Sequence, residues 1–123
     1  PLENRTKRWY SFSFLALGNT WESNNGASPP VGSTGLYHLA ILYPERKELA
    51  DALQRLQSHN ITLTGASDHG VSEALYLDDP DKNGVELYWD RPQNMWPKDE
   101  NKNLTMYIKP LDLRSLLDEV EKK

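Results

Sequence analysis

The chain has 123 residues, a formal net charge of −4 and no cysteine, which fits one small domain with a single hydrophobic core. The acidic balance argues against nucleic acid as a partner, and no apolar run reaches the roughly 18 residues of a membrane-spanning helix. Without cysteine there are no disulfides and no thiolate chemistry, and we expect a cytoplasmic protein.

The first predicted element is a β-strand over residues 9–17. Aromatic side chains alternate there with small polar ones, and the aromatic set is Tyr10, Phe12 and Phe14. Residues 18–34 are rich in Asn, Ser, Pro and Gly, a composition typical of a loop or flexible linker. The N-terminal part of the chain is therefore expected to contain one strand followed by a long connection.

Two further runs, 37–43 and 85–89, alternate in the way that indicates β-strands. Each carries a polar side chain on its less apolar face, His38 in the first run and Glu86 in the second. A helix is expected over 45–59, with one apolar stripe formed by Leu49, Leu53 and Leu56. Because this helix must cover the more apolar faces, His38 and Glu86 are expected on the uncovered face, with Tyr37 and Trp89 in the core.

The remaining elements follow from turn and cap residues. Asn60 suits a left-handed residue at the end of the helix, and short strands are expected over 61–64 and 72–77. The segment 78–84 ends in Asn-Gly and predicts a hairpin turn before the Glu86 strand. Finally, an Asp at 112 can cap a helix over 112–121, whose apolar stripe is Leu113, Leu116, Leu117 and Val120.

Three stretches of this sequence resemble one module of the vicinal oxygen chelate superfamily. They are the strand 37–42, the segment 68–77 and the segment 79–92, and the tail Pro110-Leu111-Asp112-Leu113 is similar as well. The superfamily includes glyoxalase I, fosfomycin- and bleomycin-resistance proteins and extradiol dioxygenases, and the text is most similar to the first half of Gram-positive two-domain catechol 2,3-dioxygenases. The resemblance implies an α+β fold: a βαβββ module with a curved mixed sheet over 35–92, preceded by a residual strand and followed by a C-terminal helix.

The resemblance also implies site residues. His38 and Glu86 map onto the usual metal ligands, and the ion would be a divalent Fe, Mn, Ni or Zn. From the residues alone, two ligands do not make a site, and a His or Glu on a strand is more often hydrogen-bonded or solvated. His69 lies in a predicted turn and is either bonded through its ring to the backbone, an acid/base group or a third ligand. Tyr76 and Tyr88 are expected to line the site, and His69 and Tyr88 are the catalytic candidates.

The chain departs from the family in ways that bear on assembly and chemistry. Family domains pair two modules, whereas residues 1–123 read as a single incomplete domain, so we expect a homodimer. Metal-using members gather at least three ligands from both modules, and the dioxygenase half that resembles this chain is not the half that carries iron. Three hypotheses stay open: a metal-dependent extradiol dioxygenase or glyoxalase-like enzyme, which we favour; a metal-free module that binds small molecules; or a non-catalytic half-domain of a larger dioxygenase.

Overall fold

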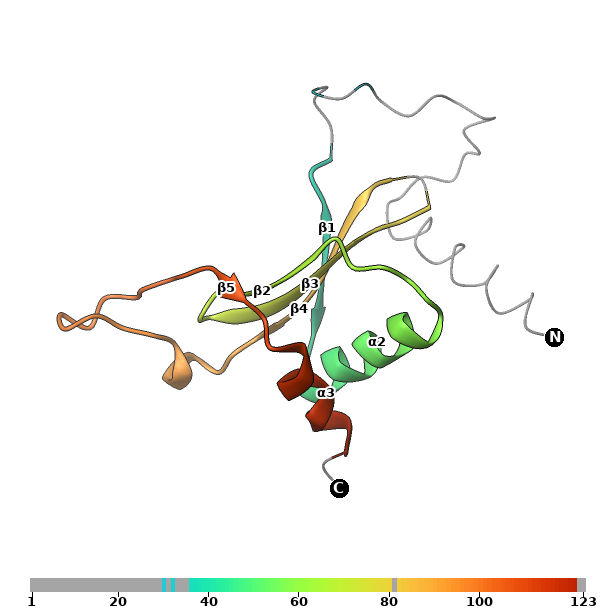
Figure 1. Cartoon of the computed structure of the whole chain (residues 1–123). Coiled ribbons are helices and arrows are strands. Elements are labelled where there is room, and N and C mark those ends of the chain that lie inside the picture. Colours follow the sequence, from blue (N-terminus) through green and yellow to red (C-terminus); the bar gives the residue numbers. More distant parts are fainter. Residues whose placement is uncertain (1–29, 31, 33–35, 81, 122–123) are drawn as a thin grey trace.

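The computed structural model describes residues 30, 32, 36–80 and 82–121, and Figure 1 shows its elements in chain order. These are β1 (Leu39–Tyr43), α2 (Arg46–Ser58), β2 (Gly65–Asp68), β3 (Ser72–Asp78), β4 (Gly84–Asp90), a short 3-10 helix (Gln93–Met95), β5 (Lys109–Pro110) and α3 (Leu113–Glu121). The strand expected over 9–17 lies outside the described residues, as does nearly all of the loop expected over 18–34.

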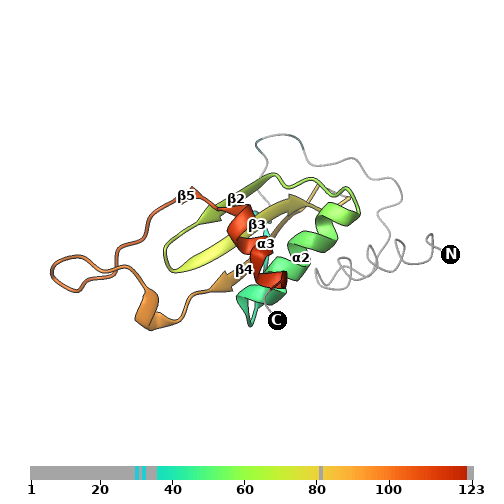
Figure 2. The same ribbon diagram turned by 60° about the horizontal axis from the view of Figure 1, so that its bottom comes forward.

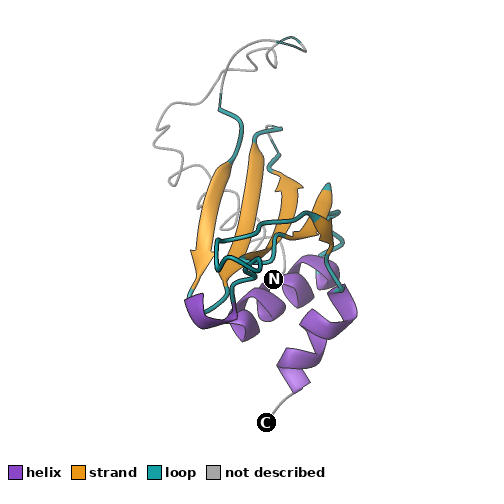
Figure 3. Cartoon of the chain, turned by 90° about the vertical axis from the view of Figure 1, so that its left-hand side faces the viewer, coloured by secondary structure: helices purple, strands orange, loops and turns teal. Residues whose placement is uncertain are grey.

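The strands form one mixed sheet in the order β1-β4-β3-β2-β5. β1 and β4 pair in parallel, and the other neighbours pair antiparallel. A parallel pair needs a long crossover, which α2 and the β2–β3 hairpin supply here. Figure 3 shows both helices on the same side of the sheet. The expected α+β fold with a βαβββ order and a C-terminal helix is therefore confirmed.

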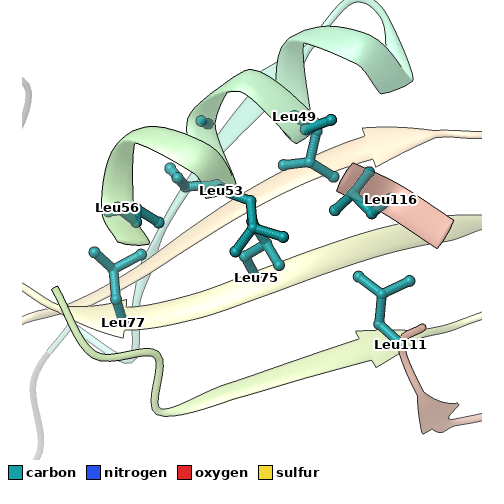
Figure 4. Close-up of a cluster of buried hydrophobic side chains, with 10 residues drawn as sticks. Leu49, Leu53, Leu56, Leu75, Leu77, Leu111 and Leu116 are labelled. Atoms are coloured by element: carbon teal, nitrogen blue, oxygen red, sulfur yellow. The ribbon is translucent and has the colours of Figure 1, made fainter. Parts of the chain in front are cut away.

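The core lies between the helices and the sheet. The predicted stripe of α2 is buried, with Leu49 and Leu53 at most 1% exposed. It faces leucines of β3 and β4 and of the C-terminal segment, and Figure 4 shows this cluster of Leu49, Leu53, Leu56, Leu75, Leu77, Leu111 and Leu116. Burying one such side chain contributes about 1.5–3 kcal/mol, so this layer accounts for much of the stability of the fold.

The alternation in β4 holds as expected. Val85, Leu87 and Trp89 pack toward the helices, which leaves Glu86 on the opposite face of the sheet. The expectation that Tyr37 joins the core is wrong, because its side chain is 89% exposed. The reason is that β1 begins only at Leu39, so Tyr37 precedes the paired part of the sheet.

The strand expected over 61–64 is also wrong, because β2 begins at Gly65. Asn60 does adopt the predicted left-handed conformation, with φ of 56°. Beyond it the chain must descend from the end of α2 to the sheet, and Ile61 and Leu63 pack against the core on the way. These branched side chains are therefore used for packing between layers rather than for a strand.

After β4 the chain makes a long excursion over residues 91–108 before it returns as β5. Figures 1 and 2 show this excursion reaching away from the sheet and helices. α3 then begins as predicted after Asp112, whose Oδ1 accepts hydrogen bonds from the backbone N–H groups of Arg114 and Ser115. Neither described helix is long and apolar enough to cross a membrane.

Candidate functional site

Four polar side chains from different elements meet on the face of the sheet opposite the helices. His38 directly precedes β1, Glu86 lies in β4, Tyr76 lies in β3 and His69 follows the end of β2. Tyr76 and Glu86 are direct cross-strand partners, so their side chains leave the sheet side by side. Backbone pairing thus places the centre of this group, and the two histidines approach it from either side.

The four side chains form a continuous hydrogen-bonded chain. His38 Nε2 lies 2.8 Å from Glu86 Oε2, and the Tyr76 hydroxyl donates to Glu86 Oε1 at 3.1 Å. His69 Nε2 lies 3.0 Å from the Tyr76 oxygen. Because the single phenolic proton is directed to Glu86, His69 Nε2 must carry the proton that it donates to Tyr76. The carboxylate therefore accepts one hydrogen bond on each oxygen, from His38 and from Tyr76.

Electrostatics fix the role of the Tyr76 phenol in this series of hydrogen bonds. Burial, together with the charge and hydrogen bond of Glu86, raises the pKa of Tyr76 to about 12. The hydroxyl therefore stays protonated at neutral pH, because ionisation would place a second negative charge beside the carboxylate. Tyr76 acts here as a fixed donor to Glu86 and not as a base.

The structure brings most of the predicted site residues together. His38 and Glu86 meet on one face as expected, while their role as metal ligands stays a prediction. Of the roles considered for His69, the ring hydrogen bond observed here goes to the Tyr76 side chain rather than to the backbone, and the acid/base and third-ligand roles stay predictions. Tyr88 is half-buried on the same face, between its strand partners Ala74 and Leu42, and its hydroxyl makes no hydrogen bond to a described residue.

The donor set does not by itself make up a metal site. Among the described residues, no group of three or more His, Cys, Asp or Glu side chains is arranged to hold an ion. The facing atoms of His38 and Glu86 are engaged with each other and with Tyr76. Since structural and catalytic sites of divalent transition metals use three or four protein ligands, the described part of the chain supplies too few.

A second polar network, which we call the ion-pair network, lies at the helix side of the sheet. Glu73 is 3% exposed and accepts hydrogen bonds from Arg46 Nε at 2.8 Å and from Arg91 Nη2 at 2.6 Å. Arg91 also binds Asp68, and Arg46 also binds Glu119 Oε1 at 2.8 Å. Charges of opposite sign therefore alternate along the network, which joins β2, β3, both helices and the residue after β4.

Two features of this site were not predicted from the sequence. Tyr76 was expected only to line the site, although counting back from the turn at 79–83 gives its pairing with Glu86. Arg91 was not singled out, and no local pattern marks it. Its partners Asp68 and Glu73 lie 23 and 18 residues away along the chain.

Comparison with known proteins identifies the family of this chain. A family model described as the Glyoxalase/Bleomycin resistance protein/Dioxygenase superfamily matches residues 9–87. The chain is 53% identical over 91 residues to the Catechol-2,3-dioxygenase of Bacillus subtilis (strain 168), covering 74% of the chain and 32% of that protein. It is 37% identical over 59 residues to Biphenyl-2,3-diol 1,2-dioxygenase 2 of Rhodococcus globerulus, covering 48% and 31%. The chain thus matches about a third of the length of either relative.

Two solved structures are similar at low sequence identity. One is a glyoxalase/bleomycin resistance protein/dioxygenase from Alicyclobacillus acidocaldarius, with a TM-score of 0.46, 16% identity and 58% of each chain covered. The other is a glyoxalase/dioxygenase from Nostoc punctiforme, with a TM-score of 0.48, 22% identity and 55% and 49% of the two chains covered. The family model, which matches more than half of the residues, shows that this chain belongs to the Glyoxalase/Bleomycin resistance protein/Dioxygenase superfamily.

Proposed function

We propose that this chain is the substrate-facing part of a dioxygenase-type protein that acts on a small molecule with vicinal oxygens, such as a catechol. In this proposal the described module binds the molecule through hydrogen-bonding side chains and holds no metal of its own. The observation that carries the proposal is the His38–Glu86–Tyr76–His69 chain on the face opposite the helices. The names of the two dioxygenase relatives support the choice of a vicinal diol.

The hydrogen-bonding pattern suggests how the face receives a diol. Each imidazole directs its Nε2 proton into the chain, so each retains Nδ1 as an acceptor for a substrate hydroxyl. When a hydroxyl proton moves to Nδ1, its O–H bond breaks, an N–H bond forms and the negative charge stays on the substrate oxygen. Glu86 stabilises the resulting imidazolium, directly at His38 and through Tyr76 at His69.

Calorimetric titration of catechol into chelator-treated protein tests this function. We expect saturable binding without metal. Tyr76→Phe should weaken it about tenfold, because loss of the hydrogen bonds between His69 and Glu86 costs about 1–1.5 kcal/mol of binding free energy. Tyr43→Phe is the matched control, since Tyr43 packs on the helix side of the sheet and its substitution removes the same hydroxyl group. No binding by the metal-free protein, or equal loss in the two variants, would contradict the proposal.

A second candidate is a metal site that His38 and Glu86 share with donors from beyond the described residues. The 2.8 Å between His38 Nε2 and Glu86 Oε2 suits neighbouring ligands of one ion at about 2.0–2.2 Å. This candidate requires His38 Nε2 to lose its proton. The metal content of protein purified without chelator separates the two candidates: near-stoichiometric Fe, Mn, Ni or Zn that is lost in His38→Ala and Glu86→Gln favours the metal site.

We also propose that the protein forms a homodimer through β1. Among the described strands β1 lies at the end of the sheet, and it exposes Ile41 by 38% and Leu42 by 53%. An apolar strand with an open edge favours pairing with another strand. We expect a dimer by sedimentation equilibrium at micromolar concentration, and dissociation in Ile41→Lys. A wild-type monomer at every concentration would refute this assembly.

A further inference from the structure

The turn that carries His69 joins β2 to β3, and its two faces hold different networks. Asp68 pairs with Glu73 across the strands, and both belong to the ion-pair network on the helix side. The next side chain, His69, points to the other side of the sheet, where it reaches Tyr76. A group that fixes Asp68 therefore also fixes the backbone from which the His69 imidazole projects.

Arg91 holds this turn at several points. Its backbone N–H donates to Val71 O at 2.8 Å, which ties the end of β4 to the turn. Its guanidinium donates to both carboxylate oxygens of Asp68, from Nη1 at 2.5 Å and from Nη2 at 3.1 Å. The same Nη2 also donates to Glu73 Oε1. A planar guanidinium suits this two-point contact, whereas an ammonium offers only a single charge centre.

The charge state of Asp68 agrees with this geometry. Burial alone would raise the pKa of the carboxyl, but the hydrogen bonds from Arg91 and from the Gly70 N–H outweigh it and lower the pKa below its ordinary value. Asp68 is therefore ionised at neutral pH. The arginine bond is then a charge-assisted one, which is stronger than a neutral hydrogen bond.

The excursion over 91–108 closes on the same turn from outside. Trp96 Nε1 donates to Arg91 O at 2.7 Å, and the Tyr107 N–H donates to His69 O at 3.4 Å. A Cβ added at Gly70 would lie 2.8 Å from both the Pro97 ring and the Tyr107 ring. The turn therefore has little room to shift while these contacts persist.

We propose that Arg91 is a positioning residue that fixes the His69 imidazole against Tyr76 by clamping Asp68. The effect of this positioning on substrate binding rests on the proposed function, whereas the positioning of His69 by Arg91 does not. Arg46 provides an internal comparison. It binds the other oxygen of Glu73 in the same network, but its remaining hydrogen bonds to described residues go to Ser115 and Glu119 and not to the turn, so a general loss of stability and a loss of positioning can be separated.

Nuclear magnetic resonance of the imidazole nitrogens tests the proposal without any substrate. The chain has three histidines, and exposed His59, whose Nδ1 lies 2.8 Å from Arg55 O, serves as a reference. In Arg91→Lys we expect the His69 nitrogens to change from a single Nε2-protonated form to averaged tautomers. The His59 signals should stay unchanged, and Arg46→Lys should leave His69 unchanged. Asp68→Asn should reproduce the effect if Arg91→Lys does not fold.

Two results would overturn the inference. The first is His69 signals that stay as in the wild type in both Arg91→Lys and Asp68→Asn. The second is a shift of the His69 signals in Arg46→Lys as large as in Arg91→Lys.

Catechol titration of the same variants is a separate arm of the test. If His69 receives the diol, we expect Arg91→Lys to bind catechol about tenfold more weakly than the wild type and Arg46→Lys to bind it as tightly as the wild type. Failure of that arm alone, with the His69 shift present, would overturn the proposed function and leave the positioning role intact.

Discussion

Glu73→Gln is expected to lower the free energy of unfolding by about 2–4 kcal/mol, because it leaves two half-buried guanidinium groups facing a neutral amide. Glu73 is 3% exposed and accepts from Arg46 on one oxygen and from Arg91 on the other. Each arginine keeps one further carboxylate partner, Glu119 or Asp68, so the loss stays below that of an isolated buried pair.

Urea denaturation followed by tryptophan fluorescence measures this loss. The matched control is Glu48→Gln, which makes the same chemical change at an exposed position in the first turn of α2. That control is expected to change stability by less than about 0.5 kcal/mol. A Glu73→Gln variant as stable as Glu48→Gln would show that the ion-pair network contributes nothing net to the fold.

Leu53→Ala is expected to destabilise the protein by about 2–5 kcal/mol, through lost burial and the cavity that remains. Leu53 is 1% exposed and lies between α2 and β3, beside Leu75 in Figure 4. Thermal or urea unfolding measures the change, and Leu104→Ala is the control because Leu104 is 48% exposed in the excursion. Equal costs in the two variants would contradict the packing of α2 on the sheet.

The periodic elements of this fold could be predicted from the sequence. The stripe of α2, the alternation of β4 and the Asp112 cap each depend on neighbouring residues, and each is observed. The errors arise where the local conformation is decided by tertiary packing rather than by neighbouring residues. Ile61 suits a strand by propensity, but the end of α2 places it on the core instead.

In the site too, some features could be predicted from neighbouring residues, whereas others depend on residues far apart in the sequence. Alternation alone predicts that His38 and Glu86 share a face, and they do. The bridge through Tyr76 needs the register of β3 on β4, which depends on the turn between them. The clamp of Arg91 on Asp68 needs the end of β4 beside the β2–β3 turn, and no periodic pattern contains that distance.

The alternation of β3 also limits how this protein can be engineered. Within four positions this strand contributes Glu73 to the ion-pair network, Leu75 to the core and Tyr76 to the hydrogen-bonded chain, and the intervening Ala74 is fully buried. A substitution chosen to improve one layer therefore changes the backbone that supports the other. Attempts to stabilise or resurface the protein have more freedom on the solvent side of α2 and at the exposed residues 98–106 of the excursion than in this central strand.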